Sequence, residues 1–282
     1  YGFAPVVKMP QNNTKASTSK SRPSRKRDFV YEAAPLIEVI VEVHWELLKL
    51  PSLGGAIDPV FSDFVGKFRA AVKKHGFVYE EDLMPPGVPL EFLADQPTKR
   101  FRLKEKVWPL FQIGPGVFTI NIIPPYQGWE NFLPTIRLGL NALYSTHQGI
   151  KNSVKITRLD LRYINGFDKN FGLKHRGKFI EDALHLAVPI PRGFKKIVKK
   201  GGANVGHEGR LNMLLNEPTG AGGVVSWKNG KINDRPAVIM EIIVRTADKP
   251  APQKTKSIIT WLNKSHEVIH QWFHSIVSAD TL

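Results

Sequence analysis

The chain of 282 residues contains no cysteine and carries 40 Lys and Arg against 25 Asp and Glu, a formal net charge of +15. The lack of cysteine excludes disulfides, thiolate metal sites and cysteine nucleophiles, and it suits a cytoplasmic protein. No apolar run reaches the roughly 20 residues that span a bilayer, so no contact with a membrane is expected. The excess of positive charge favours a polyanionic partner, either nucleic acid (RNA or DNA) or an anionic surface.

Residues 1–34 are expected to form a basic flexible tail. The segment is rich in Asn, Ser and Thr, has no hydrophobic periodicity, and cannot bury enough apolar surface to offset the entropy lost on ordering. Its basic side chains are candidates for contacts with nucleic-acid phosphates. These candidates are Lys20, Arg22, Arg25, Lys26 and Arg27. The alternative is a solvated leader that binds nothing.

Residues 35–168 show the periodicities of a first folded half. Alternating apolar residues predict strands, and apolar residues at helical spacing predict helices. The expected elements begin with a strand over Leu36–Leu48, a helix from Asp58-Pro59 to Gly76, an irregular connector over Glu80–Thr98 and a strand over Phe101–Val107. A hairpin of Leu110–Ile113 and Val117–Ile123 around Gly114-Pro115-Gly116 follows, and then a helix over Trp129–Leu143, a turn over Gly149–Asn152 and a strand over Val154–Asn165. The order β-α-β-β-α-β is the split βαβ arrangement of ferredoxin-like domains.

Residues 169–282 predict a second half, an antiparallel sheet with one helix packed on the first half. Strands are expected over Ala183–Pro191, Arg210–Leu215, Gly223–Trp227 and Ala237–Arg245, with a turn at Lys228-Asn229-Gly230 and a final helix over Ser257–Val277. A long loop follows the first of these strands, and its lysines are further candidates for phosphate contacts. They are Lys195, Lys196, Lys199 and Lys200. The predicted fold class is therefore α+β.

Several short motifs occur together between residues 35 and 278. They are Pro35-Leu36-Ile37-Glu38, Phe111-Gln112-Ile113-Gly114-Pro115-Gly116, Asn121, Tyr126 with Trp129, Leu161-Arg162-Tyr163-Ile164-Asn165, and His266 with Phe273 in the last helix. In these motifs the chain resembles a sporadically distributed bacterial family of uncharacterised proteins of about this length. The resemblance implies no established activity. The patchy distribution of that family is similar to that of genes on mobile or defence-associated islands, which implies a subunit of a defence-type assembly.

The last predicted helix contains His266-Glu267-Val268-Ile269-His270, a match to the HExxH pattern in which two histidines one turn apart bind zinc. His274 continues the same face. The neighbouring Trp272 and Phe273 indicate a packed helix face, so we predict no metal and no cofactor. A zinc-dependent hydrolase using HEVIH is the third function considered.

Two carboxylates, Asp160 and Glu241, fall inside apolar strands. A carboxylate in such a position can act in catalysis. Pairing with Arg162 or Arg245 is favoured, because ion pairs across strands are common in sheets. No nucleophile elbow or phosphate-binding glycine loop accompanies them, so no catalytic residue is assigned.

Another group of candidate nucleic-acid ligands lies in the strand expected before the hairpin. Arg100, Arg102 and Lys104 alternate there with apolar residues, close to Phe101 and Trp108. Basic and aromatic side chains on an open sheet face bind single strands in RNA-recognition folds. A solvated strand face has the same composition, and no RNP pattern is present.

The sequence thus favours a non-enzymatic module that binds nucleic acid and acts as a subunit of a larger assembly. The alternative is a protein-interaction subunit, such as an antitoxin-like scaffold, in which the basic charge serves a protein partner.

Overall fold

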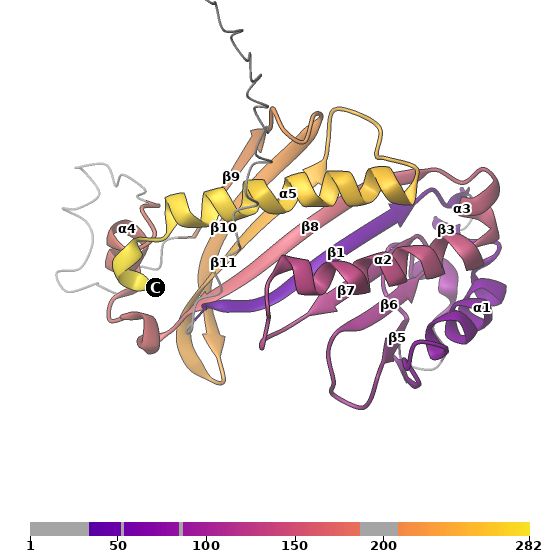
Figure 1. The fold of residues 1–282 in the computed structure, drawn as a ribbon, viewed down its shortest axis with the longest axis horizontal. Helices are drawn as coiled ribbons and strands as arrows, with labels where there is room; N and C mark the ends of the chain where they lie inside the picture. The colour runs from indigo at the N-terminus through magenta and orange to yellow at the C-terminus, as the bar shows by residue number, and fades with distance from the viewer. Residues whose placement is uncertain (1–33, 52–53, 85–86, 187–207) are drawn as a thin grey trace, which may run out of the picture.

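The computed structural model describes residues 34–51, 54–84, 87–186 and 208–282, and their main feature is a nine-stranded sheet that is antiparallel throughout (Figure 1). In spatial order its strands are β4 (Tyr79–Asp82), β5 (Lys99–Arg102), β6 (Leu110–Gly114), β7 (Val117–Ile122), β1 (Leu36–Trp45), β8 (Ile156–Phe167), β11 (Arg235–Thr246), β10 (Ala221–Ile232) and β9 (Gly209–Leu214). A separate ribbon pairs β2 (Leu48–Leu50) with β3 (Gly55–Ile57). The predicted α+β class is confirmed.

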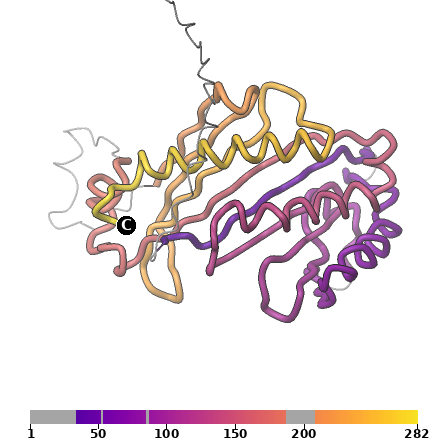
Figure 2. The backbone as a smooth tube through the Cα atoms, in the orientation of Figure 1, coloured from indigo at the N-terminus to yellow at the C-terminus, as the bar shows by residue number. Residues whose placement is uncertain are grey.

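Three long helices cover one face of the sheet. They are α1 (Phe61–Lys73), α2 (Trp129–Thr146) and α5 (Thr255–Ile276), and the last two run side by side across the strands (Figure 2). Shorter elements are α3 (Gln148–Asn152), α4 (Arg176–Asp182) and the 3-10 turns η1 (Leu90–Phe92), η2 (Lys169–Phe171) and η4 (Ala279–Thr281). In the part of the chain that the structure describes, no helix is long and apolar enough to cross a membrane.

The apolar core lies between these helices and the sheet. Val39, Val41 and Val43 alternate along β1 with no exposed surface, as a half-buried strand requires. The α2 backbone approaches the sheet closely at Gly139, where a Cβ would lie 2.7 Å from the ring of Phe111 and 2.9 Å from that of Phe118. Burying one apolar side chain such as Val41 or Phe118 stabilises the folded state by about 1.5–3 kcal/mol relative to leaving it exposed.

The predicted hairpin is confirmed. β6 pairs with β7 through Ile113 opposite Phe118, and the turn contains Gly116 at a φ of +80°. Gly114 is needed because a Cβ there would lie 1.8 Å from the carbonyl oxygen of Gln96. The hairpin is thereby fixed against the loop that precedes β5.

Three expectations for the first half are wrong in detail. The connector expected over Glu80–Thr98 contains most of the strand β4. This strand pairs with β5, with Tyr79 opposite Arg102. The strand expected over Phe101–Val107 ends at Arg102. The turn expected over Gly149–Asn152 is the short helix α3, whose first turn is capped when His147 Nδ1 accepts from the Ile150 N–H.

The second half departs further from expectation. Its strands do not form a second sheet but extend the first, because β11 pairs with β8 from Val238–Phe167 to Arg245–Asp160. Ala183–Leu186, the described part of the strand expected over Ala183–Pro191, is not extended into a strand.

The turn expected at Lys228-Asn229-Gly230 is also wrong, because β10 continues to Ile232. Asn233 and Asp234 make the turn instead, at φ angles of 48° and 61°. Gly230 is used for packing, since a Cβ there would lie 2.5 Å from Ile239 Cγ1.

Candidate functional site

The sheet face opposite the long helices carries a row of charged side chains across β1, β8 and β11. We call it the charge ladder, and its members are Glu42, His44, Arg158, Asp160, Arg162, Glu241 and Arg245. The strand register builds it, since Asp160 lies opposite Glu42 on one side and opposite Arg245 on the other. Alternation along each strand then puts the neighbouring Val41, Leu161 and Val244 on the helix-covered face.

Arg162 is the central cation of the ladder. Its Nη1 donates to Glu42 Oε1 and its Nη2 donates to Glu241 Oε1, both at 2.5 Å. Arg245 Nη2 donates to Asp160 Oδ2 at 3.2 Å. The cross-strand pairing predicted for Asp160 and Glu241 is therefore confirmed.

Burial and neighbouring charges shift the pKa values of the charge-ladder carboxylates in opposite directions. Burial alone would raise the pKa of Glu42, but the hydrogen bond from His44 and the charge of Arg162 outweigh it and lower that pKa to about 2. At Asp160 burial prevails over the attraction of Arg245 and Arg158 and raises the pKa. Asp160 is 2% exposed, and its Oδ1 has no partner within the described residues.

His44 joins the ladder to the loop before β5. Its Nδ1 lies 3.1 Å from Asp95 Oδ1, and its Nε2 lies 3.2 Å from Glu42 Oε2 and 2.7 Å from Arg158 Nη2. The ring is 4% exposed. Every charged group of the ladder thus has at least one partner of complementary chemistry, which is the arrangement expected of a structural network.

A second polar cluster lies on the helix-covered face, where α2 begins beside the middle of α5. The His266 ring stacks on Trp129 with a centroid distance of 4.7 Å, and the Tyr163 hydroxyl lies 2.9 Å from His266 Nδ1. The Tyr126 and Tyr163 hydroxyls are 3.1 Å apart, and Trp129 Nε1 donates to Asn263. Four residues that carry the family resemblance are therefore neighbours.

This cluster separates the two histidines of HEVIH. His266 is held by Trp129 and Tyr163, whereas His270 Nε2 lies 3.1 Å from His274 Nε2 on the exposed side of α5. Within the described ranges, no three His, Asp or Glu side chains are grouped so that they could hold a metal ion.

Of the three basic residues predicted in this strand, Arg100 and Arg102 lie on β5 and have an acidic partner, and Lys104 lies beyond its end. Arg102 is 6% exposed, donates to Glu81 Oε2 at 2.8 Å and lies over the Trp108 ring at 4.9 Å. Arg100 lies 3.4 Å from the same carboxylate, while Lys104 is exposed. Phe101 faces the core at 1% exposure. The other predicted ligands lie outside the described residues: Lys20, Arg22, Arg25, Lys26, Arg27, Lys195, Lys196, Lys199 and Lys200.

A cavity of about 340 Å³ lies where the chain leaves β8, between that exit and the tip of the β10–β11 hairpin. We call it the basic pocket. Its lining consists of Lys169, Leu173, Lys174, His175, Arg176, Arg235 and Pro236. No acidic residue is among them.

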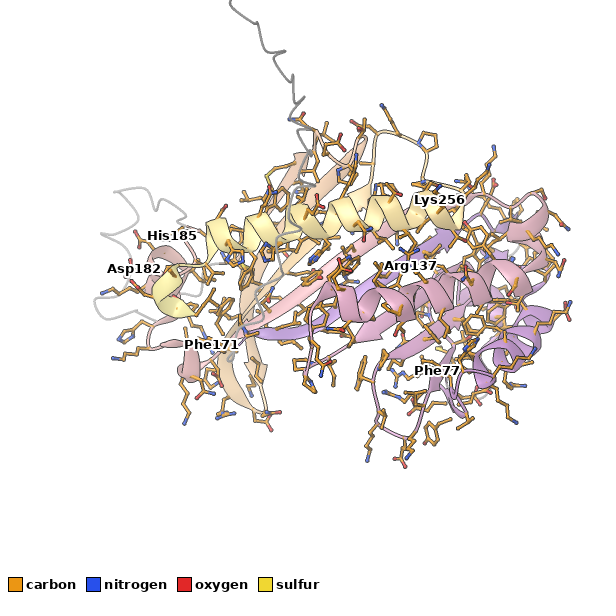
Figure 3. The ribbon with its side chains drawn as sticks, viewed as in Figure 1. Phe77, Arg137, Phe171, Asp182, His185 and Lys256 are labelled. Carbon is orange, nitrogen blue, oxygen red and sulfur yellow. The ribbon has the colours of Figure 1, made fainter. Side chains whose placement is uncertain are left out.

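Aromatic packing holds the pocket in place. Phe167 at the end of β8 contacts Phe171 at 5.7 Å and Phe179 of α4 at 5.6 Å, measured between ring centroids. Asp168 then turns the chain, because its Oδ1 accepts from the Asn170 N–H at 2.9 Å. Figure 3 places Phe171 and Asp182 at this end of the molecule, far from Lys256 at the start of α5.

The pocket cations have few partners. The ion pairs of this region within the described residues are Arg235 with Asp168 at 3.8 Å and Lys178 with Asp182 at 3.9 Å, both near the limit of contact. Arg176 Nε is buried and makes no hydrogen bond to any described residue. Sequence reasoning missed this site, although the run Lys174-His175-Arg176-Gly177-Lys178 signalled a local concentration of positive charge.

Comparison with known proteins gives no match: no family model, no curated protein and no solved structure is significantly similar to this chain.

Proposed function

We propose that this protein binds a polyanion, with nucleic acid as the ligand class, and that it does so without catalysis. The observation that carries the proposal is the basic pocket, where Lys169, Lys174, Arg176 and Arg235 line one cavity and no acidic residue is among its described lining residues. Phosphates are recognised by such groups of Lys and Arg, and guanidinium groups match their geometry.

The distribution of charge along the chain supports the same proposal. Residues 1–33 contain seven Lys and Arg against two Asp and Glu, and residues 187–207 contain five against none. Those two segments supply ten of the fifteen excess positive charges. Contacts between such segments and phosphates give affinity without reading sequence.

Salt dependence of binding tests the proposal. For about six phosphate contacts, affinity should fall roughly a thousandfold between 50 and 200 mM salt. Fluorescence anisotropy with labelled RNA and labelled duplex DNA measures it. Deleting residues 1–34, or changing Lys195, Lys196, Lys199 and Lys200 to Ala, should weaken binding to all sequences alike and flatten the slope.

A control variant tests whether affinity depends on where the lysines lie or only on the total positive charge of the chain. Lys49, Lys73, Lys74 and Lys256 are exposed on the described surface. Changing these four to Ala removes as much charge as changing Lys195, Lys196, Lys199 and Lys200 to Ala, and it should cost much less affinity. Absence of binding to either probe at 50 mM salt would refute the proposal.

A second candidate function, a protein-interaction or antitoxin-like scaffold subunit, is favoured by the β9 edge of the sheet. Leu211, Met213 and Leu214 of β9 are 46%, 38% and 70% exposed. The opposite edge, β4, is short and acidic, a form that discourages pairing. If β9 recruits a partner strand, Leu214→Lys should abolish a protein complex that survives purification of the unchanged chain.

We also propose a fold type for the first half of the chain and a family for the whole chain. The sheet order β8-β1-β7-β6, interrupted in sequence by α1 and α2, supports a ferredoxin-like split βαβ in the first half. We also propose that the chain belongs to the resembling bacterial family and acts in a cytoplasmic defence-type assembly. Four of the residues that carry the resemblance, Tyr126, Trp129, Tyr163 and His266, are neighbours in this structure.

A further inference from the structure

The shape and charge of the basic pocket distinguish it from a groove that follows a nucleic-acid backbone. Exposed lysines on a flexible arm contact successive phosphodiesters, each of which carries one negative charge. The pocket instead gathers four permanent cations and His175 around about 340 Å³, a volume typical of small-ligand sites. Several cations that face one small volume are best neutralised by a group carrying more than one charge.

Arg176 points to the kind of group. Its Nε is buried and makes no hydrogen bond within the described residues, although a guanidinium leaves a buried N–H unpaired only at a cost. Arg235 lines the same cavity from the β10–β11 hairpin, and its one ion-pair partner within the described residues, Asp168, lies 3.8 Å away and already accepts from the Asn170 N–H. Two arginines and two lysines therefore line the cavity, and within the described residues their one ion pair is that of Arg235 with Asp168 at 3.8 Å.

We infer that the basic pocket binds a phosphate monoester, a group that carries about −1.5 to −2 charges and three acceptor oxygens at neutral pH. This inference rests on the proposed function and deepens it, because a monoester occurs at the end of a nucleic-acid strand. Arg176 and Arg235 donate to the phosphate oxygens in paired hydrogen bonds. Lys169 and Lys174, both exposed at the rim, supply charge.

The test compares strands that differ only at their ends. Short labelled RNAs of one sequence carry a 5′-phosphate, a 3′-phosphate or hydroxyls at both ends, and anisotropy is measured with the full chain. One phosphorylated form should bind roughly tenfold tighter than the hydroxyl form, the effect of one charge-assisted hydrogen bond. The preference should fall below twofold in Arg176→Ala and in Lys174→Glu, the second of which changes an exposed side chain and leaves folding intact.

Matched controls remove a positive charge elsewhere. Arg100→Ala takes away an arginine that is already paired with Glu81, and Lys256→Ala takes away an exposed lysine at the far end of the molecule. Both should keep the preference for the phosphorylated end. Competition with adenosine monophosphate against adenosine identifies the source of the monoester: strong competition by the monophosphate indicates a free nucleotide, and weak competition indicates a strand end.

Two results overturn the inference. One is equal binding of all three RNAs by the unchanged chain, and the other is an end preference that survives in both Arg176→Ala and Lys174→Glu. The proposed function fails separately, since it requires that the hydroxyl-ended RNA bind at 50 mM salt. Binding of that RNA without any end preference leaves polyanion binding in place and removes the monoester site.

Discussion

The charge ladder and the basic pocket are built from similar residues in opposite balance. In the ladder, three arginines alternate with three carboxylates and one histidine, and Arg162 bonds two carboxylates at once. In the pocket, four cations line the cavity, and the one carboxylate that pairs with any of them within the described residues, Asp168, lies outside the lining and 3.8 Å from Arg235. Both lie at β8: the ladder lies on the sheet face opposite the helices, and the pocket lies where the chain leaves the strand.

The difference shows that net charge does not locate a binding site. Arg100 and Arg102 resemble nucleic-acid ligands in the sequence, yet both are paired with Glu81 on the neighbouring strand. Cations held by close acidic partners, as Arg102 is by Glu81 and Arg162 by Glu42, are committed to the fold, because removing one member leaves the other charge uncompensated. Cations without such partners are the ones available to a ligand.

Among changes that test the difference between the charge ladder and the basic pocket, Arg162→Ala should have the largest effect on the free energy of unfolding. The change leaves Glu42, which is 9% exposed, and Glu241 without their shared cation, so the free energy of unfolding should fall by about 3–5 kcal/mol. Affinity for RNA should stay unchanged in the folded fraction. Urea unfolding measures the loss. The control is Lys67→Ala, which breaks an exposed pair with Asp63 and should cost less than about 1 kcal/mol.

A second prediction uses the pKa of Glu42. Its folded-state pKa of about 2 lies below the ordinary value of 4.5, so ionised Glu42 stabilises the fold by about 3 kcal/mol, fully above pH 4.5 and lost as the pH falls toward 2. Glu42→Gln should therefore be less stable than the unchanged chain by about that amount at pH 7. The two should converge at pH 2. A stability difference that is the same at both pH values would show that the ionised state of Glu42 contributes nothing.

The parts of the fold that the sequence predicts are those with a local signal. The hairpin of β6 and β7, the long strand β1 and the helices α2 and α5 follow from apolar periodicity within each element. The joining of β11 to β8 does not, because it depends on contacts between residues such as Val238 and Phe167, which no local pattern encodes. β4 was missed because its residues, Tyr79–Asp82, show no apolar alternation.

The contacts of the candidate site likewise include some that the sequence predicts and some that it does not. The pairing of Asp160 and Glu241 with arginines could be predicted, because a carboxylate inside an apolar strand needs a cation nearby. The partner of Arg102 could not, since Glu81 belongs to the missed strand. The basic pocket combines Arg176 with Arg235, which lie far apart in the chain and meet only through the β10–β11 hairpin.

The smallest effect on stability should come from changing lysines of the basic pocket, and this change tests whether the pocket cations differ from those of the charge ladder. Lys169 and Lys174 are exposed at its rim, and neither appears in an ion pair within the described residues. Changing both to Ala should alter the free energy of unfolding by no more than about 0.5 kcal/mol, with a gain expected because repulsion among like charges is relieved. The same variant should lose most of the preference for a phosphorylated RNA end. Urea unfolding at low and high salt measures the first effect, because salt screens the repulsion and should bring the variant and the unchanged chain together. A loss above about 1 kcal/mol would place these lysines with the ladder, as cations on which the fold depends.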